Sequence, residues 1–218
     1  MTHSDLWQGA RRHLPSAPAS SAVLLLHGLG SNADDLIELA PLLAPALPET
    51  AFLSPNAPFP CDMAPFGRQW FSLQNWTPAN LWQGVCAAAP ALEQMIADVR
   101  SEFALPMARL ALLGFSQGCM MSLHVAPRLP EALGAVVGLS GALVGPEHVA
   151  AETRSRPPVL LAHGQIDPVV PYGALPLAQA TLEAAGFAVE TVTRPLMAHN
   201  IDDEVLAATA DFLRRHLS

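Results

Sequence analysis

Short runs of consecutive apolar residues recur along the chain, and longer helix-forming segments separate them. The runs 23–26 and 110–113 contain no polar residue, a pattern typical of strands buried on both faces of a parallel sheet. The pattern predicts strands at 22–26, 51–53, 110–113, 135–139, 158–162 and 188–193, and helices near 34–44 and at 83–104, 117–126, 174–185 and 202–216. Because strands alternate with helices, we expect an α/β fold with a mostly parallel sheet and helices on both faces.

Two segments fall outside this alternation. A short antiparallel strand is expected near Leu6–Ala10, and residues 54–80 form a long irregular stretch. Only a short connection separates the predicted strands at 135–139 and 158–162, which leaves no room for a large helical cap. No repeat and no long polar linker divides the sequence, so residues 1–218 are expected to form a single domain.

Composition limits the chemistry available to the chain. Its net charge is −8 with no basic cluster, which argues against a nucleic-acid partner. All 11 basic residues are arginine, which excludes Schiff-base chemistry, a pyridoxal-phosphate anchor, a Ser–Lys dyad and a phosphate-loop lysine. The 3 cysteines lack the spacing of a disulfide framework or a zinc site. Since no apolar segment has signal-peptide or membrane-spanning length, a cytoplasmic protein without integral membrane association is expected.

The segment Gly114-Phe115-Ser116-Gln117-Gly118 matches G-x-S-x-G, the nucleophile elbow that places a serine on a sharp turn between a strand and a helix. The pattern alone is weak, because two glycines and a serine recur by chance. Its context is specific: the apolar run 110–113 precedes it, and a buried helix that ends before Pro127 follows it. Ser116 is therefore the predicted nucleophile, which needs a base and an acid that orients the base.

The acid and the base are expected after the serine, in that order. Asp167 is the predicted acid, because it follows the strand at 158–162 and Pro168 biases it to extended backbone. His199 is the predicted base, because it lies in a loop between the last strand and the last helix. The competing candidates are His148, His163 and His216 for the base, and Asp202 and Asp203 for the acid. His163 is interpreted as a structural histidine at a strand end.

An oxyanion hole needs two backbone N–H groups aimed at one point. One is expected from Gln117, the residue after the nucleophile, and the other from a loop after an early strand. The segment 27–30 follows the first buried strand directly, and its glycines let the backbone approach a substrate closely. Leu29 is the predicted second donor. The alternative is a tight strand-to-helix connection without a ligand contact.

Aromatic residues concentrate between residues 52 and 82. Most of them are interpreted as a small core that holds the long irregular stretch in place. Because binding pockets are often lined by aromatic side chains, part of 59–76, together with the backbone after Leu29, is predicted to form an apolar acyl pocket. Phe66, Trp70 and Phe71 are the candidate lining residues.

These motifs together resemble the carboxylesterase and acyl-protein thioesterase family of small α/β-hydrolases. The resemblance covers nearly the whole chain and rests on the ordered segments His27-Gly28-Leu29-Gly30, Ser54-Pro55-Asn56-Ala57-Pro58 with Gln69-Trp70-Phe71, Gly114-Phe115-Ser116-Gln117-Gly118, His163-Gly164-Gln165-Ile166-Asp167-Pro168-Val169-Val170-Pro171 and Ala198-His199-Asn200-Ile201. It implies an α/β-hydrolase fold without a large cap domain, Ser116, Asp167 and His199 as the triad, and Leu29 and Gln117 as the oxyanion hole. Ala198 and Ser72 depart from the family pattern in loops expected near the pocket.

The resulting hypothesis is a serine carboxylic-ester hydrolase that acts through an acyl-enzyme on short- to medium-chain acyl esters. An acyl-protein thioesterase and a lysophospholipase use the same chemistry and stay open as alternatives, and a non-catalytic ligand-binding module is the alternative from another class. No metal and no organic cofactor is implied. The expected partner is a small-molecule acyl ester or thioester, and the apolar loops leave a homodimer open.

Overall fold

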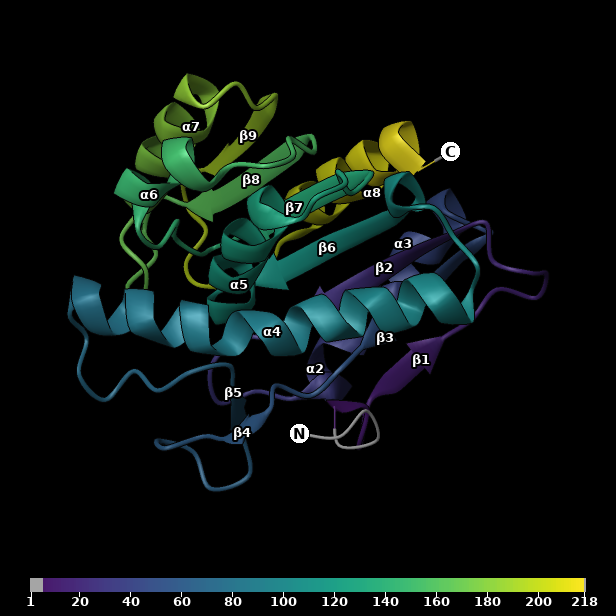
Figure 1. The fold of residues 1–218 in the computed structure, drawn as a ribbon, viewed down its shortest axis with the longest axis horizontal. Coiled ribbons are helices and arrows are strands. Elements are labelled where there is room, and N and C mark those ends of the chain that lie inside the picture. The colour runs from purple at the N-terminus through teal and green to yellow at the C-terminus, as the bar shows by residue number, and fades with distance from the viewer. Residues whose placement is uncertain (1–5, 218) are drawn as a thin grey trace.

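One seven-stranded sheet organises the computed structural model, which describes residues 6–217 (Figure 1). Its strands are β1 (Arg11–His13), β2 (Ser21–Leu26), β3 (Thr50–Ser54), β6 (Leu110–Phe115), β7 (Ala135–Leu139), β8 (Val159–Gly164) and β9 (Val189–Arg194). They lie in the order β1-β3-β2-β6-β7-β8-β9, and all neighbours are parallel except β1, which is antiparallel to β3. The mostly parallel sheet predicted from the apolar runs is confirmed.

Helices cover both faces of this sheet. One face carries α4 (Pro78–Glu102), α5 (Gln117–Val125), α6 (Pro146–Glu152) and α7 (Ala174–Ala184), and the other carries α2 (Ala33–Ile37), α3 (Ala40–Leu43) and α8 (Asp203–Leu217). In Figure 1, α4 crosses in front of the sheet and α8 lies behind it. Alternate residues of β2 enter opposite cores: Leu24 and Leu26 pack on the α4 side, and Val23 and Leu25 on the α8 side. This double burial explains why the runs 23–26 and 110–113, in the central strands β2 and β6, are apolar throughout.

The remaining elements are short. Three 3₁₀ turns are η1 (Ala44–Ala46), η2 (Met107–Arg109) and η3 (Ala126–Arg128), and a two-stranded sheet pairs β4 (Phe59–Pro60) with β5 (Arg68–Gln69). The connection between β7 and β8 holds only α6, so the described residues contain no large cap over the sheet. Neither α6 nor the β4–β5 hairpin was predicted from the sequence pattern.

Two helix boundaries differ from the sequence prediction, and a proline lies at each of them. The helix predicted near 34–44 is two helices, because Pro41 has no N–H to bond the carbonyl of Ile37 and instead sits in the first turn of α3. Helix α4 begins at Pro78 rather than at residue 83. The Oγ1 of Thr77 caps this start by accepting the N–H of Asn80 at 3.2 Å.

The antiparallel strand at the beginning of the described chain lies at 11–13 rather than near 6–10. Arg11 pairs with Ser54 and His13 pairs with Phe52, so β1 extends the sheet beyond β3. The predicted orientation is confirmed and the predicted position is wrong. Residues 1–5 and 218 of the predicted single domain lie outside the described residues, and the single domain itself stays a prediction.

Candidate active site

Ser116 lies at the junction of β6 and α5, in a backbone conformation that few residues adopt. Its φ is 54° and its ψ is −114°, a strained combination for a residue with a side chain. The flanking glycines allow this turn. A Cβ on Gly114 would overlap the backbone of Gly118, and a Cβ on Gly118 would overlap the carbonyl of Leu26. The predicted strand–elbow–helix arrangement is therefore present, and it presents the serine at the carboxyl edge of the sheet.

Asp167 and His199 follow β8 and β9 at this same edge. The Nδ1 of His199 lies 2.7 Å from the Oδ2 of Asp167. The other oxygen, Oδ1, accepts the N–H groups of Val169 at 2.8 Å and Val170 at 2.9 Å. Burial alone would raise the pKa of Asp167, but hydrogen bonds from His199, Val170 and Val169 outweigh it and hold the pKa below its usual value. The carboxylate therefore stays ionised and fixes His199 with its Nδ1 proton toward Asp167.

His163 contacts the same carboxylate from inside the protein. Its Nε2 lies 2.9 Å from the carbonyl oxygen of Val170 and 3.3 Å from the Oδ2 of Asp167. A carbonyl only accepts hydrogen bonds, so Nε2 carries the proton. The ring is buried, and it supports the loop that holds Asp167. This agrees with the interpretation of His163 as structural.

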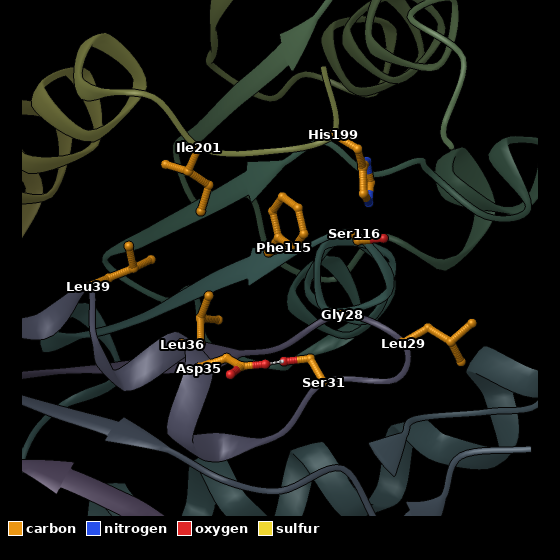
Figure 2. Close-up of a pocket in the computed structure, with 10 residues that line it drawn as sticks. All are labelled: Gly28, Leu29, Ser31, Asp35, Leu36, Leu39, Phe115, Ser116, His199 and Ile201. Atoms are coloured by element: carbon orange, nitrogen blue, oxygen red, sulfur yellow. Dashed lines mark hydrogen bonds between the residues drawn. The ribbon is translucent and has the colours of Figure 1, made fainter. Parts of the chain in front are cut away.

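Ser116 and His199 line one pocket of about 370 Å³. Its lining residues, drawn in Figure 2, are Gly28, Leu29, Ser31, Asp35, Leu36, Leu39, Phe115, Ser116, His199 and Ile201. The ring of Phe115 lies 4.9 Å from the imidazole of His199. Within residues 6–217, no hydrogen bond joins the Oγ of Ser116 to His199, and such bonds are often long before substrate binds. The pocket is mainly apolar, with the hydrogen-bonded Ser31 and Asp35 on one side.

The loop after β2 lies against the elbow. A Cβ on Gly28 would be 3.2 Å from the Cβ of Ser116, and Leu29 is part of the pocket wall. In the described part of the chain, no hydrogen bond joins the N–H group of Leu29 or of Gln117 to a protein acceptor, whereas the N–H groups of Gly30 and Ser116 donate to the carbonyls of Arg68 and Leu139. Two backbone donors without a protein acceptor therefore lie close to Ser116 in the structure, one in the loop after β2 and one in the next residue of the chain.

His27 anchors this loop, a contact that the sequence analysis missed. Its Nδ1 lies 2.7 Å from the carbonyl oxygen of Gly28, and its Nε2 accepts the N–H of Ala57 at 2.9 Å. Burial lowers the pKa of His27 to about 4, so the ring is neutral near pH 7. A histidine at the end of an apolar strand carries no pattern that distinguishes such an anchor from a loop histidine.

Phe66, Trp70 and Phe71, the predicted lining of an acyl pocket, do not line the cavity that contains Ser116, and their contact with a substrate stays a prediction. Phe66 is 94% exposed, Trp70 is fully buried and Phe71 is 4% exposed, and none of them is in the pocket wall. Trp70 and Phe71 are instead hydrogen-bonded beneath the elbow, where they contact Gln117 and His27. The wall comes from Leu36, Leu39, Phe115 and Ile201. Leu36 and Leu39 stand three residues apart, a spacing equally typical of a helix face that packs on the core, and Phe115 and Ile201 are single apolar residues in the elbow and in a loop, so the sequence did not single them out.

A second apolar cavity of about 380 Å³ lies on the other side of the elbow helix. Its walls come from the start of α4, from Met120 in the first turns of α5, and from the loops after β7 and β8. Trp76, Leu81, Val144 and Val170 contribute side chains to it. The structure therefore offers two separate apolar cavities, one lined by Ser116 and one lined in part by Met120 of the helix that follows it.

Among residues 6–217, no three His, Cys, Asp or Glu side chains are grouped as a metal site would require. In the same part of the chain, no helix is long and apolar enough to cross a bilayer.

Known proteins resemble this chain over most of its length. The profile of the phospholipase/carboxylesterase family matches residues 11–217. The esterase YpfH of Escherichia coli is 30% identical over 92% of this chain and 84% of its own length, and acyl-protein thioesterase 1 of Yarrowia lipolytica is 31% identical over 74% and 77%. The crystal structure of esterase PE8 superposes with a TM-score of 0.92 at 38% identity, covering 95% of this chain and 98% of its own.

Proposed function

This chain belongs to the phospholipase/carboxylesterase family of serine hydrolases, and from that premise we propose that Ser116, His199 and Asp167 are its catalytic triad. One observation carries the proposal. The strained serine of the elbow shares a pocket with His199, whose Nδ1 is bound by a buried carboxylate. The family makes the protein an enzyme that hydrolyses esters or thioesters; the roles of individual residues are our inference.

In the proposed first step, the Nε2 of His199 takes the proton of Ser116 while Oγ attacks the ester carbonyl carbon. The carbonyl π-electrons move to oxygen and give a tetrahedral oxyanion. The carbon–oxygen bond to the alcohol then breaks, and His199 returns the proton to the departing alcohol. In the second step His199 takes a proton from water as the water oxygen attacks the acyl carbon. The bond from this carbon to Ser116 Oγ then breaks, His199 returns the proton to Oγ, and the acid is released.

The N–H groups of Leu29 and Gln117 are proposed to stabilise the oxyanion. They flank Ser116 and have no protein acceptor among the described residues, so both are available to a ligand. Loss of one such donor in comparable sites lowers the rate by about 10²–10³-fold. Because both donors belong to the backbone, substitution of their own side chains does not remove them.

The proposed substrates are short- to medium-chain acyl esters. The family implies a small-molecule ester, and the apolar pocket that touches Ser116 supports an acyl chain of limited length. Thioesterase and lysophospholipase activities remain alternatives with the same chemistry, and a relative named acyl-protein thioesterase supports the first of them.

A homodimer is proposed through the exposed side chains of Phe59, Met63 and Phe66, and light scattering would measure its mass.

The test is hydrolysis of p-nitrophenyl esters from acetate to palmitate, alongside an acyl-thioester peptide, by the wild type and Ser116→Ala. Ser101→Ala, on the exposed side of α4, is the matched control. We expect an optimum at short or medium chains, lost in Ser116→Ala and kept in Ser101→Ala. A folded wild type that cleaves only the thioester would favour the thioesterase, and inactivity on every substrate would favour a binding module.

Two further variants distinguish the cavities. Leu36→Trp fills the pocket beside Ser116, and Leu81→Trp fills the second cavity. If the acyl chain occupies the first pocket, only Leu36→Trp shifts the optimum toward shorter chains. A shift in Leu81→Trp alone would assign the chain to the second cavity.

A further inference from the structure

The side chain of Gln117 is buried within a hydrogen-bond network between two loops. Its residue is 1% exposed. The amide oxygen accepts the backbone N–H of Trp70 at 2.9 Å, and the amide nitrogen donates to the carbonyl of Phe71 at 2.7 Å. Both polar atoms of the amide are therefore used, and they fix segment 70–71 against the first turn of α5.

Trp70 connects this segment to the loop after β2. Its indole N–H donates to the carbonyl oxygen of His27 at 3.0 Å, and its ring is fully buried, with its centroid 6.0 Å from the His27 ring. His27 in turn contacts the carbonyl of Gly28 through Nδ1. A continuous series of hydrogen bonds thus runs from the residue after Ser116 to the residue before Leu29.

The strand β5 reinforces the same connection. The N–H of Gly30 donates to the carbonyl of Arg68 at 2.9 Å, and the N–H of Arg68 donates to the carbonyl of Ser31 at 2.8 Å. Residues 68–71, which we call the clamp segment, are therefore hydrogen-bonded to the loop 27–31 at one end and to Gln117 at the other.

The two proposed oxyanion donors lie just beyond the end of the ladder between β2 and β6, whose last paired residues are Leu26 and Gly114. Leu29 lies beyond the end of β2, and Gln117 begins α5. Their spacing matters, because a misplacement of about 1 Å in a catalytic group can cost on the order of 10²-fold in rate. Hydrogen bonds depend on direction as well as distance, so the hydrogen bonds of the clamp segment restrict the spacing between Leu29 and Gln117 more than apolar contacts would.

We propose that Gln117 and Trp70 are positioning residues whose side chains hold the N–H groups of Leu29 and Gln117 at the spacing an oxyanion requires. This inference rests on the proposed function. Since the oxyanion exists only in the transition state and the intermediates, a loosened clamp segment lowers kcat and leaves substrate binding nearly unchanged.

The test compares Gln117→Met, which keeps length and volume but forms neither hydrogen bond, with Trp70→Phe, which removes only the indole N–H and part of the ring. Gln94→Met on the exposed face of α4 and Trp82→Phe, which lies outside the clamp segment, are the matched controls. Each variant is checked for folding by circular dichroism. Steady-state kinetics with p-nitrophenyl butyrate and affinity for a trifluoromethyl ketone, which forms a tetrahedral adduct, are then measured.

We expect kcat to fall at least about tenfold in Gln117→Met, with KM within about twofold of wild type. Affinity for the ketone should fall in parallel with kcat/KM, and Trp70→Phe should show the same pattern to a smaller extent. The double variant should lose less than the product of the two single losses, because both side chains act through one segment.

Folded variants with unchanged kcat, or with a change in KM alone, would overturn the proposal, and so would fully multiplicative losses in the double variant. The variant Ser116→Ala distinguishes failure of the positioning role from failure of the proposed function. If Ser116→Ala removes activity while the clamp variants keep it, only the positioning role is wrong. If Ser116→Ala stays active, the esterase mechanism itself is wrong.

Discussion

At the residue scale, Asp167 is held by contacts to both of its carboxylate oxygens. Its carboxylate accepts two backbone N–H groups and the Nδ1 proton of His199, and the Nε2 of His163 lies 3.3 Å away. These contacts keep the acid ionised and fix the tautomer of His199. The orientation of His199 therefore depends on the buried negative charge of Asp167, whose two oxygens both accept hydrogen bonds.

Asp167→Asn should lower kcat/KM by on the order of 10⁴-fold, because an amide can donate to Nδ1 and so favour the wrong tautomer of His199. The control is Asp202→Asn, which keeps an oxygen to accept the N–H of Val205 at the start of α8. The measurement is p-nitrophenyl butyrate hydrolysis at pH 8. If Asp202→Asn caused the larger loss, Asp167 would not be the triad acid.

Two buried histidines make stability depend on pH. Burial lowers the pKa of His27 to about 4 and that of His124 to about 3. An unfolded histidine titrates near 6.5, so below that pH the unfolded chain binds protons that the folded chain does not. The free energy of unfolding should therefore fall as pH drops from 6.5 toward 4, by up to about 1.4 kcal/mol per pH unit for each histidine.

His124→Phe tests this prediction, because it keeps a ring against Trp82 and removes the titrating group. Urea unfolding at pH 7.5 and at pH 5 should show a smaller loss of stability at pH 5 in the variant than in the wild type. Equal losses in the two proteins would mean that His124 is protonated in the folded state.

The residues of the site differ in how far the sequence could reveal them. Ser116, Asp167 and His199 stand in motifs whose order and spacing indicate a triad, and the structure brings Asp167 into contact with His199 and places Ser116 in the same pocket. Trp70 is buried and hydrogen-bonded to the loop after β2, a contact that the sequence did not reveal, because composition cannot tell an aromatic ring that lines a pocket from one that anchors a loop.

At the element scale, the β4–β5 hairpin is a support for the loop that precedes α2. Gly67 packs directly on Gly30, and a Cβ at residue 67 would overlap the backbone of Gly30. Because backbone atoms cannot rotate away as a side chain does, any larger residue at 67 must move one of the two loops.

Gly67→Ala should therefore lower kcat by about tenfold or more, through displacement of the loop that carries Leu29. Gly173→Ala is the matched control, since nothing lies within 4 Å of a Cβ at that position. Kinetics and thermal unfolding of both variants give the comparison. An active Gly67→Ala with wild-type kcat would show that the hairpin does not set the position of this loop.

Two helix boundaries that the sequence prediction placed wrongly do have local signals. Thr77 and Pro78 form a standard helix start, and Pro41 marks the break between α2 and α3, so both boundaries follow from residues in the sequence once the capping and proline rules are applied. The strands β4 and β5 are two residues each, too short for any alternation of apolar and polar residues to appear. Their pairing depends on contacts with loop 27–31, which no local pattern encodes.

At the scale of the whole molecule, the order of the parallel strands assembles the site. β6, β8 and β9 end at one edge of the sheet, so residues far apart in sequence meet there. This convergence follows from the alternation of strands and helices alone, which is why the fold class and the site edge were predictable while the pocket walls were not.

One sheet that runs through most of the chain predicts cooperative unfolding. Thermal unfolding followed by far-ultraviolet circular dichroism and by tryptophan fluorescence should give coincident transitions. The four tryptophans, at positions 7, 70, 76 and 82, report on the amino-terminal half, whereas dichroism reports on the whole chain. Two separated transitions would contradict the single domain expected for residues 1–218.

The central claim is that Ser116 is a nucleophile activated by His199, and covalent labelling tests it most directly. The protein is treated with a fluorophosphonate, digested with trypsin and mapped by mass spectrometry. The fragment 110–128, between Arg109 and Arg128, contains only Ser116 and Ser122 as serines. The account predicts one adduct, on Ser116, that forms much more slowly in His199→Gln. An adduct on another residue, or equal labelling rates in the two proteins, would contradict it.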